Sequence, residues 1–297
     1  MRNKKRVVVL GKNNISINCT KILLEEKDVQ VVACCPNKND NGIDGWQNSF
    51  FSFCNENNIE ILQLEKITNR MSIDILQKLN IDFIFSFQYD QIINQEVIDV
   101  PKYGAINLHF SPLPKYRGVS PIAWALINNE KTYGVTLHYM DPGIDTGDII
   151  SQELFEIESI KNARELYDKC EELGTILFKK SLKKLLNGNF KRVAQDNSEG
   201  IYYSKNSIDF NKSEIEFNKS TFMLYNWIRA FIFPPFQFPK FQYNGKWVEV
   251  CAVKPIYNKN KFEKPGSLIN NNSGKFLFST QDCYIELITK NNIKEHL

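Results

Sequence analysis

The chain of 297 residues has few histidines, little net charge and no long apolar stretch. Its 3 histidines are His109, His138 and His296, so an enzyme that needs an imidazole near neutral pH has few to choose from. The formal net charge of +3 is too small an excess to predict nucleic-acid binding. No apolar run approaches the roughly 18 residues of a membrane span. We therefore expect a soluble cytoplasmic protein that binds neither nucleic acid nor membrane.

Metal and redox motifs are also missing. The 7 cysteines are odd in number and contain no C-x-x-C pair, which argues against a disulfide framework and a zinc finger. No His, Cys and Asp cluster has the spacing of a metal site, so we expect no metal. The G-x-G-x-x-G fingerprint is absent after the first predicted strand, which argues against a nicotinamide-dependent oxidoreductase.

Strands and helices alternate in the first part of the chain. Apolar, β-branched runs predict strands over 5–10, 29–34 and 81–87, with a weaker one over 60–63. Helices are expected after Gly11, with Ser16 as a candidate N-cap, and over 72–79. This alternation predicts a Rossmann-like, mostly parallel sheet with helices on both faces. Ligands of such α/β sheets lie beyond the carboxyl ends of the strands.

The rest of the chain divides into two parts. Strands are predicted over 104–110, 134–140 and 148–157, and helices over 119–129 and 160–187. After about residue 198 a helix over 220–233 precedes short strand-like runs over 240–253, 265–270, 274–279 and 283–289. We therefore expect a catalytic domain over 1–200 and a small β-rich, barrel-like domain over 206–297.

Three polar residues stand out near the end of the predicted strand 104–110. Asn107 and His109 alternate along that strand and so point to the same face. Asp145 lies in a glycine-rich loop after the next strand. A carboxamide can donate to a developing oxyanion, an imidazole can take a proton near pH 7, and a carboxylate can orient that imidazole. The residues alone leave open that His109 is a core histidine and Asn107 a turn residue.

A series of motifs now gives a resemblance. The motifs are Asn107-Leu-His109, Ser111-Pro-Leu-Pro114, Arg117-Gly118, Gly134-Val-Thr-Leu-His138 and Asp145-Thr-Gly-Asp148. Together, and in this order, they resemble the N10-formyltetrahydrofolate-dependent formyltransferases, which include methionyl-tRNA formyltransferase and sugar N-formyltransferases. The second domain resembles the family's C-terminal β-barrel module more weakly, through Trp227-Ile-Arg-Ala230 and Pro265-Gly-Ser267.

The resemblance implies an N-formyltransferase that uses N10-formyltetrahydrofolate as cosubstrate. It implies that His109 is the general base, that Asn107 donates to the oxyanion and that Asp145 positions His109. His138 is interpreted as structural. The folate loop 111–114 departs from the family's Ser-Leu-Leu-Pro at Pro112, which lacks an N–H donor. The residues expected to bind the cosubstrate are Phe85, Ser86, Phe87, Gln88, Tyr89, Asp90, Ser111, Pro112, Leu113, Pro114 and Gly143.

The amine acceptor separates the members of this family. The segment from Cys35 to Trp46 contains one lysine and two aspartates, which suits tRNA phosphates poorly. The segment from Trp227 to Pro234 resembles bacterial sugar N-formyltransferases. We therefore expect a nucleotide-linked amino-dideoxy sugar, first of all dTDP-4-amino-4,6-dideoxyglucose, destined for surface glycans such as the lipopolysaccharide O-antigen. The expected substrate-binding residues are Lys12, Asn13, Asn14, Arg117, Trp227, Arg229 and Phe236.

Other interpretations stay open. The alternatives are a methionyl-tRNA formyltransferase, a formyltetrahydrofolate hydrolase with water in place of the amine, and an inactive folate- or sugar-binding protein. The aromatic residues of segment 231–247 can stack on a nucleotide base or form the core of a small barrel. The aromatic second domain also suggests a homodimer.

Overall fold

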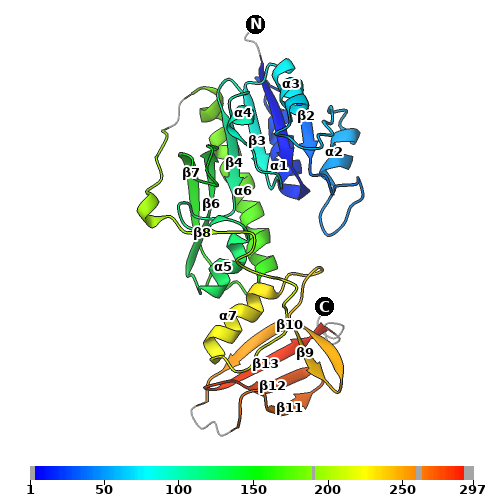
Figure 1. The fold of residues 1–297 in the computed structure, drawn as a ribbon, viewed down its shortest axis with the longest axis vertical. Coiled ribbons are helices and arrows are strands. Elements are labelled where there is room, and N and C mark those ends of the chain that lie inside the picture. The colour runs from blue at the N-terminus through cyan, green and yellow to red at the C-terminus, as the bar shows by residue number, and fades with distance from the viewer. Residues whose placement is uncertain (1–3, 189–190, 259–262, 291–297) are drawn as a thin grey trace. The chain divides into compact units, whose positions relative to one another are not determined.

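The computed structural model describes residues 4–188, 191–258 and 263–290 (Figure 1), so His296 lies outside the described residues. The chain forms two compact units. Unit 1 combines Met1–Gly118, Gly134–Phe155 and Lys169–Tyr202, and unit 2 combines Val119–Tyr133, Glu156–Asp168 and Tyr203–Leu297. Among the described residues, no helix has both the length and the apolar character needed to cross a bilayer.

Unit 1 is built on a six-stranded sheet in the order β2-β1-β3-β4-β6-β7. The strands are β1 (Lys5–Gly11), β2 (Val29–Pro36), β3 (Phe83–Phe87), β4 (Ala105–His109), β6 (Thr132–Tyr139) and β7 (Ile149–Glu156). The pairs β1–β2, β1–β3 and β3–β4 are parallel, whereas β4 and β6 are antiparallel. The predicted mostly parallel α/β sheet is confirmed, and its β4–β6 pairing makes it mixed.

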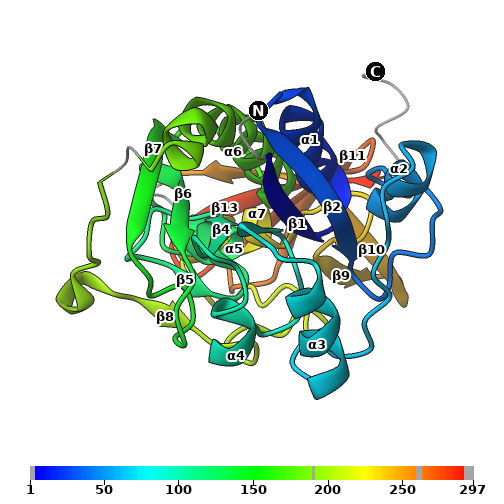
Figure 2. The same cartoon turned by 90° about the horizontal axis from the view of Figure 1, so that it is seen from above.

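Helices cover both faces of this sheet (Figure 2). α1 (Asn13–Glu25) and α6 (Ala163–Leu186) lie on one face, and α3 (Arg70–Lys78) and α4 (Gln95–Ile98) lie on the other. α2 (Phe50–Glu56) follows β2 in the chain. The central strands β1 and β3 are buried on both faces, so their sequences are continuous apolar runs rather than alternating ones.

Two local predictions were wrong. Ser16 is not the N-cap of α1, because the helix begins at Asn13 with Lys12 as its N-cap. The buried Ser16 hydroxyl lies 2.8 Å from the carbonyl oxygen of Lys12 and 2.9 Å from that of Phe87. Segment 60–63 is not a regular strand, since Ile61 forms only an isolated bridge with Cys34. The helices α2 and α4 were not predicted.

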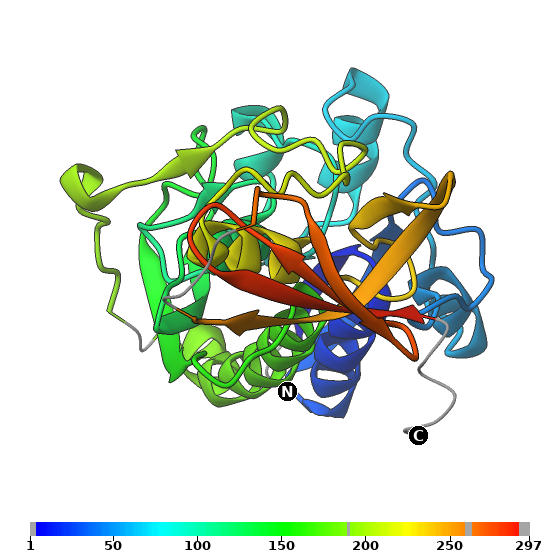
Figure 3. The ribbon, with the colours of Figure 1, turned by 90° about the horizontal axis from the view of Figure 1, so that it is seen from below.

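Unit 2 contains α5 (Pro121–Ile127), α7 (Thr221–Phe231) and a five-stranded antiparallel sheet in the order β11-β12-β13-β10-β9 (Figure 3). Its strands are β9 (Lys240–Tyr243), β10 (Lys246–Ile256), β11 (Leu268–Asn272), β12 (Lys275–Ser279) and β13 (Tyr284–Thr289). Leu224 and Ile228 of α7 pack with Phe241, Phe276 and Leu287 of the sheet in one core. Elsewhere, the two-residue strand β5 (Arg117–Gly118) pairs with β8 (Tyr202–Tyr203).

Candidate active site

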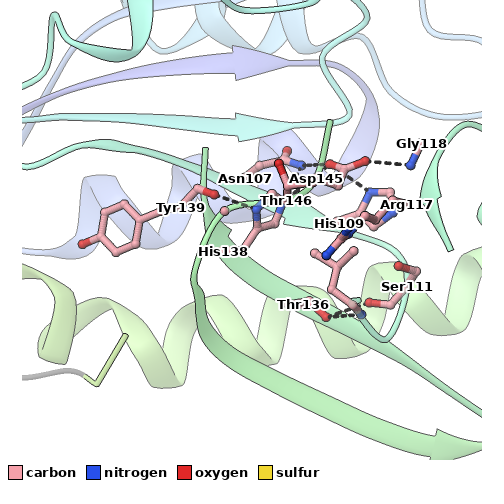
Figure 4. Close-up of polar contacts among 12 residues, drawn as sticks. Asn107, His109, Ser111, Arg117, Gly118, Thr136, His138, Tyr139, Asp145 and Thr146 are labelled. Carbon is pink, nitrogen blue, oxygen red and sulfur yellow. Dashed lines mark hydrogen bonds and ion pairs between the residues drawn. The ribbon is translucent and has the colours of Figure 1, made fainter. Parts of the chain in front are cut away.

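Four polar side chains meet beside the antiparallel strands β4 and β6 (Figure 4). Asn107 and His109 come from β4, and His138 comes from β6, where it is the register partner of Asn107. Asp145 reaches them from the loop that joins β6 to β7. The structure therefore brings together the predicted trio of amide, imidazole and carboxylate, and it adds a second imidazole.

His109 is held in one orientation by a backbone carbonyl. Its Nε2 atom lies 2.9 Å from the carbonyl oxygen of Tyr116, and because a carbonyl only accepts, Nε2 carries the proton. The left-handed backbone of Tyr116, with φ of 62°, is part of the turn that presents this carbonyl. The Nδ1 atom of His109 lies 3.7 Å from Oδ1 of Asp145, which is ion-pair range but longer than a hydrogen bond. Nδ1 is therefore the atom that can take up a proton.

Asp145 is the negative centre of the cluster, with its side chain only 13% exposed. Its Oδ2 atom accepts a hydrogen bond of 2.9 Å from the Gly118 backbone N–H, and its Oδ1 atom accepts one of 3.4 Å from Asn107. Burial by itself would raise the pKa of this carboxyl, but His109, His138 and the Gly118 amide outweigh burial and hold the pKa well below its ordinary value. Asp145 is therefore ionised at neutral pH.

His138 is a member of the site that the sequence analysis assigned only a structural part. It is 2% exposed, and its Nδ1 atom donates to the Tyr139 carbonyl oxygen at 2.7 Å. In the neutral ring Nε2 is then free to accept, and it lies 3.2 Å from Nδ2 of Asn107. It also lies 3.5 Å from Oδ1 of Asp145. The two hydrogens of the Asn107 amide thus have two acceptors, His138 and Asp145.

The loop that carries Asp145 is closed by its own side chains. Asp141 accepts hydrogen bonds from the backbone N–H of Gly143 at 3.1 Å and from the Thr146 hydroxyl at 2.6 Å. Gly147 must be glycine, because a Cβ atom there would lie 2.0 Å from the Tyr139 carbonyl oxygen. Gly143, expected to bind the cosubstrate, is exposed and helps to form this closed loop.

The strand part of the predicted folate set lies in the core. Phe85 and Phe87 are fully buried and pack edge-on against Phe178 of α6, so their side chains are structural, contrary to expectation. Ser86 is also buried, at 3% exposure.

The next three residues leave the sheet. The carbonyl of Gln88 and the backbone N–H of Asp90 both bind the side chain of Asn37. Tyr89 is half-buried with its hydroxyl 3.6 Å from the sulfur of Cys35, and burial raises the pKa of that hydroxyl. Asp90 is exposed. Of the segment 85–90, the turn after β3 is therefore the part that can meet a ligand.

The predicted folate loop 111–114 is tied down by other parts of unit 1. The Ser111 carbonyl accepts from the Thr136 hydroxyl at 2.7 Å, and the Leu113 carbonyl accepts from Gln152 at 2.8 Å. The Pro114 carbonyl accepts from the backbone N–H of Ile201, and the Leu113 N–H donates to Thr136. Pro112 has no N–H, so few backbone groups of this loop remain for a ligand.

The residues of unit 1 that were predicted to bind the amine substrate have different surroundings. Lys12, Asn13 and Asn14 are partly exposed at the start of α1, and the Asn14 N–H already donates to the side chain of Gln47 at 3.2 Å. Arg117 is only 8% exposed, and its guanidinium donates to Gln195 and Asn197. The Arg117 guanidinium is therefore bonded inside unit 1, and its expected contact with substrate stays a prediction.

The residues of unit 2 that were predicted to bind the amine substrate also include both buried and exposed side chains. Arg229 is 4% exposed and donates to Asn226, Asn129 and two backbone carbonyls within unit 2. It is a core residue rather than a substrate contact. Trp227 stacks on Phe231 with ring centroids 4.1 Å apart, and only Phe236 is largely exposed, at 66%. Among the described residues, no three His, Cys, Asp or Glu side chains are grouped as metal ligands.

The geometry defines the protein as an α/β enzyme. In its site His109 can accept a proton, Asn107 can donate a hydrogen bond to an oxygen that gains negative charge, and Asp145 can stabilise an imidazolium. The chain belongs to the formyl transferase family. Residues 5–182 match the family model "Formyl transferase", and residues 207–294 match "Formyl transferase, C-terminal domain".

Sequence and structural relatives differ in their acceptors. The methionyl-tRNA formyltransferase of Clostridium tetani is 36% identical over 76% of this chain and 71% of its own length. A sugar 3N-formyl transferase, crystallised with dTDP and 5-N-formyl-THF, is 33% identical with a TM-score of 0.77, over 98% of this chain and 99% of that one. An N-formyltransferase from Helicobacter canadensis, in complex with folinic acid and dTDP-3-aminofucose, is 32% identical with a TM-score of 0.75, over 96% and 99%.

Proposed function

We propose that this formyltransferase moves the formyl group of N10-formyltetrahydrofolate to the amino group of a nucleotide-linked amino sugar. The observation that carries the proposal is the convergence of Asn107, His109 and Asp145 at one place in unit 1. Two solved relatives that align with nearly the whole chain were crystallised with a formylated folate and with dTDP or a dTDP-sugar, which supports both substrates.

His109 is the base in this proposal. An amine that attacks a carbonyl carbon must lose a proton, and the Nδ1 atom of His109 has the free lone pair to accept it. The resulting imidazolium donates to the Tyr116 carbonyl through Nε2, which it already faces at 2.9 Å. Its new charge at Nδ1 faces the Asp145 carboxylate at 3.7 Å. Asp145 therefore favours proton uptake without itself being protonated.

Asn107 supplies the donor for the formyl oxygen, which gains negative charge during the attack. Its amide hydrogens point at His138, at 3.2 Å, and at Asp145, at the longer distance of 3.4 Å. When Asp145 turns to the imidazolium of His109, the weaker of these two bonds is the one that Asn107 exchanges for the substrate oxygen. His138 keeps the other hydrogen engaged and so holds the amide plane in place.

We assign the pterin ring to two segments of the predicted cosubstrate set. The turn of Gln88, Tyr89 and Asp90 leaves the sheet beside β1, and Gly143 and Ile144 are exposed in the loop next to Asp145. A partly apolar surface with a few polar groups suits a flat heterocycle. In the proposal these two segments bind the carrier, whereas Phe85 and Phe87 support them from the core.

The choice of a sugar over tRNA rests on the loop that follows β2. Its two aspartates close the loop itself: Asp40 accepts from Ser49 and Phe51, and Asp44 accepts from the Ser49 backbone N–H. Lys38 is the only cation of the segment from Cys35 to Trp46. A cavity of about 390 Å³ beside this loop is lined by Asp40 and Glu65 as well as Lys38. Phosphates of a tRNA stem need a surplus of cations, which this loop does not offer.

Methionyl-tRNA is the second candidate acceptor. The methionyl-tRNA formyltransferase from Clostridium tetani is 36% identical over 76% of this chain, and the two sugar enzymes are 33% and 32% identical over nearly all of it. The catalytic cluster does not distinguish the acceptors, because either one presents a primary amine. The surface around residues 35–46 is the feature on which the choice depends.

One experiment separates these functions. The purified chain is incubated with N10-formyltetrahydrofolate and, in parallel, with dTDP-, UDP- and GDP-linked 3-amino and 4-amino sugars, with methionyl-tRNA and with buffer alone. Mass spectrometry follows the gain of one formyl group, and absorbance follows tetrahydrofolate release. Formylation of a nucleotide sugar supports the proposal. Formylation of methionyl-tRNA alone would reject the sugar, and release of formate alone would indicate a hydrolase.

A further inference from the structure

We propose that Gln195 is a positioning residue for catalysis, which holds the loop of Asp145 in its active arrangement and is itself oriented by Arg117. The inference rests on the proposed formyl transfer, because it assigns Asp145 a part in that reaction. Gln195 lies between the two segments matched by the family models, 5–182 and 207–294, and belongs to none of the motifs that carry the family resemblance.

Gln195 binds the Asp145 loop through the backbone at two points. Its Nε2 atom donates to the carbonyl oxygen of Asp145 at 2.9 Å and to that of Gly147 at 2.7 Å. A side-chain amide nitrogen has two hydrogens, so both are used on this one loop. The two carbonyls belong to the residues on either side of Thr146. Gln195 thus binds the loop through its backbone, while Asp141 binds it through the Thr146 hydroxyl.

Arg117 fixes which end of the Gln195 amide faces the loop. Its Nε and Nη2 atoms donate to the Gln195 oxygen at 3.1 Å and 2.8 Å. A guanidinium has only donors, so the amide oxygen must face Arg117 and the amide nitrogen must face the loop. The buried Arg117 makes two bonds to this one oxygen, and a Cβ atom on Gly200 would lie 2.8 Å from its guanidinium. The arginine thus has little freedom to turn away.

The backbone of Asp145 shows why the loop needs an external support. Its φ of 56° lies in the left-handed region, which is uncommon for non-glycine residues although aspartate adopts it more readily than most. The carboxylate at the end of this turn has to reach the Gly118 N–H and face His109 at once. Loss of the Gln195 donors frees the carbonyls on both sides of Thr146 and lets the carboxylate move. A shift of about 1 Å in such a group can cost about 100-fold in rate.

The test compares Gln195→Glu, Gln195→Ala and a matched control, Asn197→Ala. Gln195→Glu keeps an oxygen for Arg117 and preserves the side-chain shape, but its other oxygen cannot donate to the loop. Asn197→Ala removes a different acceptor of Arg117, whereas the two bonds from Arg117 to Gln195 and the two bonds from Gln195 to the loop stay in place. We expect kcat to fall about 10- to 100-fold in both Gln195 variants, with KM for both substrates nearly unchanged. Asn197→Ala should keep kcat close to the wild-type value.

A second measurement does not depend on which amine substrate receives the formyl group. The Gly118 N–H donates to the carboxylate of Asp145, so its amide NMR signal and hydrogen-exchange rate report where that carboxylate lies. We expect Gln195→Glu to shift the signal and speed exchange, and Asn197→Ala to leave both as in the wild type. Unchanged Gly118 exchange in Gln195→Glu, or equal changes in Asn197→Ala, would overturn the inference. Wild-type protein without formyl transfer to any acceptor would instead overturn the proposed function.

Discussion

Asn107 and His138 face each other across the antiparallel pair β4–β6, with Nδ2 of the amide 3.2 Å from Nε2 of the ring. The Nδ1–H of His138 donates to the Tyr139 carbonyl, so Nε2 of the neutral ring faces Asn107 as a hydrogen-bond acceptor. This pairing leaves His109, whose Nδ1 faces the carboxylate, as the imidazole that exchanges a proton. The two histidines of the site thus have different tasks.

Replacement of His138 should therefore lower the rate by a modest factor. His138→Ala leaves one hydrogen of the Asn107 amide without its acceptor, and a hydrogen bond of this kind is worth about 1 kcal/mol, or about 5-fold in kcat. His138→Gln places an amide oxygen at a similar reach and should recover most of the rate. Steady-state kinetics on both variants test this, with thermal melts to compare their folding. Full activity in His138→Ala would show that Asn107 does not need this partner.

Replacement of the predicted base and its carboxylate should have a larger effect. His109→Ala removes the proton acceptor, and we expect at least about a 100-fold loss of kcat. Asp145→Asn keeps the side-chain shape and an oxygen for the Gly118 N–H. It removes the charge that stabilises the imidazolium, so we expect kcat of this variant to fall by about 100-fold or more as well. Single-turnover rates measure the chemical step directly. Rates near wild type in both variants would reject the mechanism.

Asp145 should also affect how stability changes with pH. Its pKa in the folded protein lies below the ordinary value of 3.8, so the unfolded chain takes up a proton first as the pH falls. The stabilisation from this carboxylate is then complete above about pH 5 and is lost progressively below it. Denaturant unfolding of the wild type and of Asp145→Asn at a series of acidic pH values tests this. The wild type should lose stability more steeply, and parallel curves would contradict the expected shift.

Much of the fold could be predicted because local patterns and tertiary structure agree. The continuous apolar run of β1 and the alternation of strands with helices lead to a parallel sheet. The run over 240–253 was expected as one strand, but it divides into β9 and β10 at a hairpin turn of Asn244-Gly245, where both residues have positive φ, at 50° and 74°. The start of α1 was misjudged because Ser16, a common N-cap residue type, instead uses its hydroxyl inside the core. Local propensity cannot report such a contact.

The site could be predicted only where chain spacing determines geometry. Asn107 and His109 lie two residues apart on one strand, so a shared face follows from strand geometry alone. His138 joins them through the antiparallel register of β6, and an alternating pattern does not reveal the direction in which strands pair. Arg117 and Arg229 were assigned to substrate because they belong to motifs that resemble the family, but both are buried among carbonyl and amide acceptors.

Arg229 should then affect stability rather than acceptor binding. Its guanidinium donates to the carbonyls of Leu126 and Ile160 and to Asn129, all within unit 2. We expect Arg229→Ala to lower the free energy of unfolding by about 2 to 4 kcal/mol, because buried acceptors lose their donor. Arg70→Ala is the control, since its ion pair with Asp74 is exposed. A raised KM for the sugar in Arg229→Ala without a loss of stability would restore the substrate role.

A methyl group at Gly147 should disable the site without touching any of its polar side chains. The added Cβ atom would lie 2.0 Å from the Tyr139 carbonyl oxygen, so the loop of Asp145 has to move away from β6. We expect Gly147→Ala to lower kcat by about 100-fold through displacement of the carboxylate. Gly45→Ala is the matched control, because a Cβ atom there meets nothing within 4 Å. Kinetics and thermal melts of both variants separate the two effects. A fully active Gly147→Ala enzyme would show that catalysis tolerates a displaced Asp145.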